Sequence, residues 1–119
     1  MDLSLVREAA SSSEMPFGAR ASDQYEILKE YIEEFQSSLD SEHEVGMKLT
    51  SFGESVLLNV TSVDYENPVL IIFKGFKNGS EATLIQHVSQ LNFMLVSVKK
   101  EPNKPKRIIG FRANDYEEE

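Results

Sequence analysis

Apolar residues recur at helical spacing over one long stretch of the chain, residues 23–40, and predict an amphipathic helix packed on a sheet. The apolar stripe of this stretch consists of Leu28, Tyr31, Ile32, Phe35 and Leu39. Asp23 is expected to accept backbone N–H bonds in the first turn, with Glu26 completing a capping box three residues later.

From Val45 onward the pattern changes to short alternating runs with turn residues between them, which predicts strands. The runs are Val45–Phe52, Ser55–Val63, Val69–Phe76, Ala82–His87, Phe93–Lys100 and Lys106–Phe111. Asn78-Gly79 is a hairpin signal, because both residues tolerate the positive φ angles of a type I′ turn. Neither Gly nor Pro separates the fourth and fifth runs, so a 3₁₀ turn near Val88–Leu91 is expected to redirect the chain.

The predicted fold class is α+β: one N-terminal amphipathic helix packed on a curved antiparallel sheet of about five or six strands. The same plan is found in Sm-like and SH3-like small barrels, so a closed barrel and an open sheet both remain alternatives. We divide the chain into a flexible N-terminal tail (residues 1–21), a single domain (residues 22–112) and an acidic C-terminal tail (residues 113–119).

Charge is divided unevenly along the chain, which has a formal net charge of −8. Residues 1–66 hold four cations and fourteen anions, whereas residues 67–112 hold eight cations and two anions. A chain with two oppositely charged parts can attract two kinds of partner. The acidic helix and tail and the lack of Trp argue against duplex nucleic acid as a partner.

Composition narrows the classes of function further. The chain has no Cys, which excludes disulfides, thiolate metal sites and a cysteine nucleophile. No apolar run approaches the roughly 18 residues that span a bilayer, and the N-terminus lacks the pattern of a secretory signal, so a cytoplasmic protein without a membrane partner is expected. We find no catalytic motif and no metal-ligand or cofactor motif, and we expect no enzyme activity.

Several short motifs distributed over roughly residues 24–111 carry a family resemblance. They are His43-Glu44-Val45-Gly46, Phe52-Gly53, Asn67-Pro68, Leu84-Ile85-Gln86-His87-Val88-Ser89-Gln90-Leu91 and Arg107-Ile108-Ile109-Gly110-Phe111. With these motifs the chain resembles small bacterial and bacteriophage proteins grouped as a domain of unknown function. The resemblance implies no catalytic residues. It implies a phage or prophage accessory protein in the host cytoplasm, of a kind that often inhibits host defence by binding.

Two groups of residues are candidates for ligand binding. The first is a polar cluster, Gln86, His87 and Gln90, whose alternative role is to satisfy backbone groups where the strand pattern breaks. The second is a set of cations that a hairpin of the last two strands would gather: Lys99, Lys100, Arg107 and Arg112, with Lys104 and Lys106 nearby. Such cations can hold phosphate groups, or they can form a solvated hairpin tip.

Two acidic groups are candidates for protein interaction, because they can mimic the charge of nucleic acid in a basic groove. They are Glu30, Glu33 and Glu34 on the polar helix face, and Glu117, Glu118 and Glu119 in the C-terminal tail. Their alternative role is to keep the protein soluble.

Three hypotheses follow. The leading one is a non-enzymatic protein, expected to be a homo-oligomer, that binds and modulates a host or self protein. The second is an oligomeric sponge that sequesters a phosphate-bearing nucleotide signal without cleaving it. The third, and least favoured, is an enzyme that acts on small phosphates.

Overall fold

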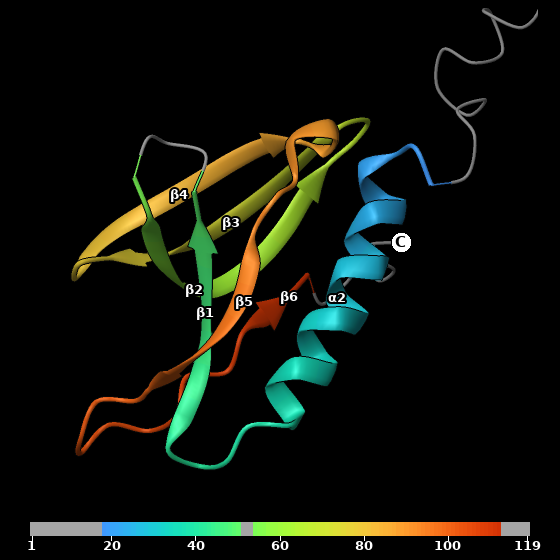
Figure 1. Ribbon diagram of the computed structural model, residues 1–119. Helices are drawn as coiled ribbons and strands as arrows, with labels where there is room; N and C mark the ends of the chain where they lie inside the picture. Colours follow the sequence, from blue (N-terminus) through green and yellow to red (C-terminus); the bar gives the residue numbers. More distant parts are fainter. Residues whose placement is uncertain (1–17, 51–53, 113–119) are drawn as a thin grey trace, which may run out of the picture.

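A computed structural model describes residues 18–50 and 54–112 of the protein (Figure 1). Its elements are α2 (Ala21–Ser37), β1 (His43–Leu49), β2 (Val56–Glu66), β3 (Leu70–Lys77), β4 (Ser80–His87), the 3₁₀ turn η1 (Val88–Gln90), β5 (Met94–Lys99) and β6 (Gly110–Phe111). The predicted α+β class is confirmed, and so is the 3₁₀ turn between the fourth and fifth strands. The acidic C-terminal tail and residues 1–17 of the N-terminal tail lie outside the described residues.

Five strands form a curved antiparallel sheet in the order β4-β3-β2-β1-β5. In Figure 1 the sheet bends around on itself while α2 lies along one side of it. The sheet does not close into a barrel, because β4 and β5 stand at its two ends and do not pair with each other. The open sheet is therefore the alternative that the protein adopts.

The predicted hairpin of Phe93–Lys100 with Lys106–Phe111 is wrong. β5 pairs with β1 over six residue pairs, from His43↔Lys99 to Lys48↔Met94. The last strand is only two residues long and pairs in parallel with β2, at Ser62↔Gly110 and Val63↔Phe111. A parallel contact this short depends on distant parts of the chain and leaves no local pattern.

The position of β6 follows from a separation of β1 and β2. These two strands pair at Met47↔Leu58, Lys48↔Leu57 and Leu49↔Val56, and then diverge. Beyond that point β6 lies beside β2, between the sheet and α2 (Figure 1). The segment that leads into β6 therefore runs past the place where the two strands separate.

The helix packs on the sheet through Ala21, Tyr25 and Ile32, which are buried. Leu28, Phe35 and Leu39 are partly buried against the same core, so the helical spacing is confirmed for most of the predicted stripe. Tyr31 was wrongly included, since its side chain is 64% exposed. The sheet contributes the rest of the buried core: Val45, Met47, Leu49, Leu58, Val60, Val63, Ile71, Phe73 and Ile109.

The start of the helix is held by the turn that joins β2 and β3. Ala21 donates its backbone N–H to the carbonyl of Pro68 (2.7 Å), and Ser22 donates to the side-chain oxygen of Asn67 (2.9 Å). The predicted capping box is therefore wrong: Asp23 accepts instead from the N–H of Gly18 (3.1 Å), ahead of the helix. The orphan donors of the first turn are satisfied by a segment more than forty residues away in sequence.

Candidate functional site

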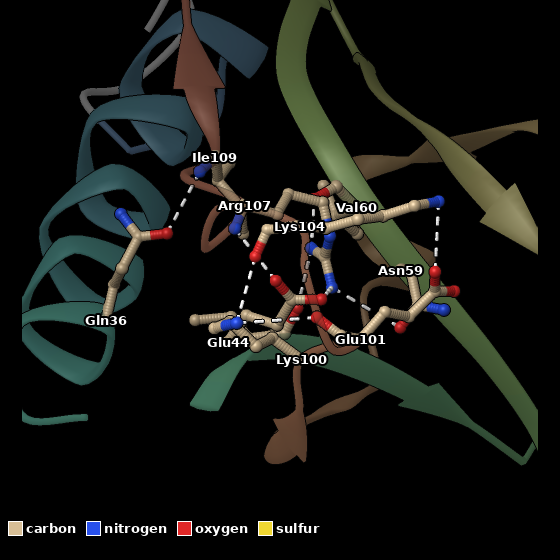
Figure 2. Close-up of polar contacts among 10 residues, drawn as sticks. Gln36, Glu44, Asn59, Val60, Lys100, Glu101, Lys104, Arg107 and Ile109 are labelled. Atoms are coloured by element: carbon tan, nitrogen blue, oxygen red, sulfur yellow. Dashed lines mark hydrogen bonds and ion pairs between the residues drawn. The ribbon is translucent and has the colours of Figure 1, made fainter. Parts of the chain in front are cut away.

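Arg107 occupies the place where β1 and β2 separate (Figure 2). Its Nη1 donates to the carbonyl of Val45 on β1 (2.9 Å) and to the carbonyl of Val60 on β2 (2.6 Å). Extending the β1–β2 register by two pairs would place Val45 opposite Val60, where each carbonyl could accept an N–H bond from the other strand. The strands have diverged at this point, and the guanidinium donates to both carbonyls instead. One side chain thus joins the two strands across the gap.

The same guanidinium is neutralised within the chain. Nη2 donates to Glu44 Oε2 (3.3 Å) and to Asn59 Oδ1 (3.4 Å), while the backbone N–H of Arg107 donates to Glu44 Oε1 (2.8 Å). The side chains of Arg107 and Glu44 are only 16% and 13% exposed. Four of the five guanidinium N–H donors are used, so Arg107 is held in one orientation.

A pocket of about 390 Å³ lies beside this cluster. Its wall includes the side chain of Phe76, which is 40% exposed, and its rim includes Lys104. Residues from β1, β2, the β3–β4 hairpin and the segment before β6 line it: Glu44, Asn59, Phe76, Gly79, Glu101, Lys104, Pro105 and Arg107. The pocket combines an aromatic surface, an amide and two paired cations.

The loop that follows β5 is fixed by its own lysines. Lys100 Nζ donates to the carbonyls of Lys104 (2.9 Å) and Glu101 (3.4 Å), and Lys104 Nζ lies 3.0 Å from the carboxylate of Glu101 (Figure 2). Lys106 Nζ donates to the carbonyls of Leu39 (3.3 Å) and Asp40 (3.0 Å), just after α2. Lys100 and Lys106 thus bind backbone oxygens of the protein itself, and Lys104 pairs with a carboxylate.

Arg112 lies elsewhere, next to Tyr65 near the far end of β2. Its Nε is 2.7 Å from Asp64 Oδ1, its Nη2 donates to the carbonyl of Tyr65 (2.9 Å), and its guanidinium carbon is 4.0 Å from the centre of the Tyr65 ring. Its backbone N–H donates to the hydroxyl oxygen of Tyr25 on α2 (2.6 Å). Burial lowers the pKa of Arg112, but Asp64 and Tyr65 raise it more, so its pKa lies above the usual value and the side chain stays charged.

The polar cluster at η1 satisfies backbone groups. His87 donates its N–H to Gln90 Oε1 (2.8 Å), and the N–H of Ser89 donates to His87 Nδ1 (3.0 Å). Gln86 is buried, and among the described residues its Oε1 has no hydrogen-bond partner. The cluster precedes β5 and the lysine loop follows it, so six strand residues, roughly 20 Å, separate the two groups. Within one copy of the chain, the fold therefore does not bring these two groups of predicted ligand residues together.

Lys99 differs from the other predicted cations. Its side chain is exposed, and it makes no hydrogen bond or ion pair with any other residue of the described part of the chain. It stands at the end of β5, on an edge of the sheet. Lys99 is thus the one member of the predicted set, within residues 18–50 and 54–112, that the fold leaves available.

The acidic helix face is exposed as predicted. Glu30, Glu33 and Glu34 face solvent on α2, and the exposed apolar side chains of Ile27 and Tyr31 lie among them. Beside Tyr31 a groove of about 350 Å³ is lined by Leu28, Tyr31, Ile32, Leu91, Asn92, Phe93 and Leu95. The other acidic group, Glu117, Glu118 and Glu119, lies outside the described residues.

Sequence reasoning missed Phe76, Asn59 and Glu44 as pocket residues. The available signal was weak: Phe76 ends an apolar strand next to the Asn78-Gly79 turn, where an aromatic side chain is easily left exposed. Within residues 18–50 and 54–112, no three His, Cys, Asp or Glu side chains are arranged to hold a metal ion. Over the same residues no helix is both long and apolar enough to cross a membrane.

Comparison with known proteins gives a family but no function. A protein-family model described as "Family of unknown function (DUF6173)" matches residues 20–112. Neither a curated protein nor a solved structure matches the chain. The predicted resemblance to an uncharacterised domain is confirmed at this level.

Proposed function

The chain belongs to the DUF6173 family, whose description assigns no activity, and from the geometry of the Arg107 pocket we propose a non-enzymatic binding protein that holds a phosphate-bearing, nucleotide-like molecule without cleaving it. The observation that carries this proposal is the pocket of about 390 Å³ in which the exposed ring of Phe76 lies near Asn59 and Lys104. Pockets of this size accommodate small organic ligands.

Each part of the pocket offers a contact to one part of such a ligand. The ring of Phe76 can stack on a planar base, an interaction worth about 1–3 kcal/mol per base in single-stranded nucleic-acid binding. The amide of Asn59 can bond to the polar edge of the base. Lys104 can turn from Glu101 to a phosphate at little cost, because an exposed ion pair contributes only about 0–1 kcal/mol.

The network around Arg107 supports binding because it fixes the pocket before a ligand arrives. Arg107 joins β1 to β2, and Lys100 closes the loop that carries Lys104. A preformed pocket spares the ligand the entropic cost of ordering its walls.

The state of the carboxylates supports holding rather than cleavage. Glu44 is paired with Arg107, and Glu101 with Lys104. Glu44, which Arg107 holds on both carboxylate oxygens, is therefore not free to act as a general base.

The proposal is tested on the purified full chain by native mass spectrometry and an ultraviolet spectrum. A co-purified adduct that adds absorbance near 260 nm supports the proposal, since the chain has no Trp and only four Tyr. Chromatography must recover the adduct unchanged, because turnover would contradict the non-enzymatic part.

A variant series then locates the site, using the adduct or, failing one, ADP and a cyclic dinucleotide as probes. Phe76→Ala should weaken binding by about tenfold or more, whereas Phe76→Tyr keeps the ring and should retain it. Ile27→Ala removes an apolar residue of the same exposure, 40%, on α2 away from the pocket and serves as the control. The proposal fails if no adduct and no probe binding is found, or if Phe76→Ala binds as well as the parent.

A second candidate function rests on the helix face. In this hypothesis a phage or prophage accessory protein binds a host or self protein, such as a defence protein, in a basic groove. Ile27 and Tyr31 are exposed beside Glu30 and Glu34 on α2, so an apolar patch lies next to charged side chains, a combination that interfaces use. Joint replacement of Glu30, Glu33 and Glu34 by Gln should abolish capture of that protein from host lysate, while Phe76→Ala leaves it intact. Equal capture by both variants argues against the helix face.

A further inference from the structure

The two edge strands of the sheet, β4 and β5, each pair with a described strand on one side only, β4 with β3 and β5 with β1. Both strands are long for edges, with eight and six residues, and contain no Pro. Each also exposes a large apolar side chain, Ile85 at 58% and Met94 at 54%. Exposed edges of this kind attract another strand, and natural proteins usually protect them.

The backbone groups that β5 presents can be identified from its pairing with β1. Lys100 donates its N–H to the carbonyl of Glu42 (2.8 Å), which continues the β1–β5 register by one pair. Hydrogen-bonded pairs alternate along an antiparallel ladder, so Leu95, Ser97 and Lys99 direct their N–H and C=O groups away from β1. These three residues form the outer edge of β5.

The same reasoning gives the outer edge of β4. Val88 donates its N–H to the carbonyl of Val69 (2.8 Å), one pair beyond the β3–β4 register. Alternation from that pair leaves Glu81, Thr83 and Ile85 with their backbone groups directed outward.

The outer edge of β4 ends at η1. The next outward N–H, that of His87, is already taken by Gln90 Oε1 (2.8 Å). The capping contact of His87 and Gln90 thus limits the open run to three residues, the same number that β5 presents.

We infer that β4 of one copy pairs in antiparallel fashion with β5 of a second copy of this chain, with Glu81 opposite Lys99, Thr83 opposite Ser97 and Ile85 opposite Leu95. In this register every outward N–H and C=O meets another outward group. It also sets an anion against a cation, a hydroxyl against a hydroxyl, and an apolar side chain against an apolar side chain.

This pairing uses the one predicted cation that the described residues leave without a partner, Lys99. Glu81 is the Cα partner of Phe76 in the β3–β4 register, so the two side chains share a face of the sheet. Lys99 of the second copy would arrive on that face. The pairing therefore adds a cation on the Phe76 face of the sheet, although it does not depend on a ligand there.

The contact is head-to-tail, since it joins two different edges. Each copy keeps one free β4 and one free β5 when two copies meet, so assembly continues until a ring closes or a filament forms. A copy related by simple two-fold pairing of β5 with β5, or of β4 with β4, would not join Glu81 to Lys99.

Charge reversal of the two residues tests both the surface and the register. Mass photometry or light scattering at low salt should show that the parent assembles. Glu81→Lys and Lys99→Glu alone should each raise the concentration of half-assembly about tenfold, because each places like charges opposite each other. An equimolar mixture of the two variants, and the double variant, should both assemble again to within about threefold of the parent.

The control is Glu66→Lys, which reverses an exposed charge away from both edges and should assemble as the parent does. Circular dichroism of each variant shows that the fold persists. The inference is overturned if the parent stays monomeric up to about 100 μM, which corresponds to an association free energy weaker than about −5.5 kcal/mol. It is equally overturned if the single reversals have no effect, or if the mixture and the double variant fail to assemble.

Discussion

The acidic helix face and the basic segment that follows β5 use their charges in opposite ways. Glu30, Glu33 and Glu34 point into solvent, whereas Lys100, Lys106, Arg107 and Arg112 each bind oxygen atoms within the chain. The sequence has two oppositely charged parts, but much of the positive part is consumed as internal cross-links. The surface is therefore more uniformly acidic than the linear charge pattern indicates.

The difference follows from where backbone oxygens lack partners. Among the described residues, carbonyls are left over at Leu39 just past the end of α2, at the separation of β1 and β2, and at Lys104 in the loop after β5, and a cation binds at each of these places. A buried polar group without a partner costs about 1–3 kcal/mol, and the two Arg107 bonds to strand carbonyls are partly buried, so this cation contributes stability that exposed glutamates do not.

The largest loss of stability is expected for Arg107→Ala. The substitution leaves Glu44 buried without its partner and two strand carbonyls unbonded, so the free energy of unfolding should fall by about 3–5 kcal/mol in urea titration. Lys104→Ala, which removes an exposed ion pair from the same loop, should cost less than about 1 kcal/mol. Equal effects of the two substitutions would contradict an internal role for Arg107.

A smaller effect is expected for Arg112→Ala. The side chain is about one-third exposed, so its ion pair with Asp64 is partly screened, and the loss of that pair with the stacking on Tyr65 should cost about 1–2 kcal/mol. Arg112→Lys keeps the charge but not the planar stacking, and should recover only part of the stability. Full recovery with Lys would show that charge alone holds this end of the domain.

Replacing Glu30, Glu33 and Glu34 together by Gln should change the free energy of unfolding by less than about 0.5 kcal/mol, because these side chains make no ion pair with other described residues. The measurement is the same urea titration. A loss comparable to that of Arg112→Ala would mean that the helix face also has internal partners, and the comparison would fail.

The smallest effect concerns Asp40, an anion of the acidic half that does bind within the chain. The hydrogen bond to the His43 side chain and then the bond from the Glu42 N–H hold the pKa of Asp40 below its ordinary value of 3.8. Because the folded pKa is the lower one, this contribution is present above pH 3.8 and is lost as the pH falls through the folded pKa. Asp40→Asn should therefore flatten the acid limb of the stability curve slightly, and a carboxyl NMR titration should locate the lowered pKa directly.

The sequence predicted the helices and strands of this fold better than it predicted which segments contact each other. The helical stripe and the Asn78-Gly79 turn are local patterns, and both are found. The helix start is set by Asn67 and Pro68, and β6 pairs with a strand that precedes it by nearly fifty residues. Contacts at such separations leave no period in the sequence.

The candidate site was predicted only in part, for a physical reason. A lysine or arginine looks the same in sequence whether it faces a phosphate or a carbonyl, so Arg107 was predicted as a ligand residue and its internal partners were not foreseen. Phe76 was assigned to the sheet, and its place at the end of a strand beside the Asn78-Gly79 turn was only a weak indication that its ring would remain exposed in a pocket.

The contacts that Arg107 makes have a consequence for how the protein folds during its synthesis on the ribosome. Both strands that it joins, and the helix that Lys106 and Arg112 contact, are synthesised long before residues 106–112 emerge. A nascent chain that has just finished β5 still has its two central strands separated at one end, with orphan carbonyls and uncovered core. Completion of the domain is therefore a late event in translation, and chains interrupted before Arg107 should be preferred substrates for chaperones and proteases.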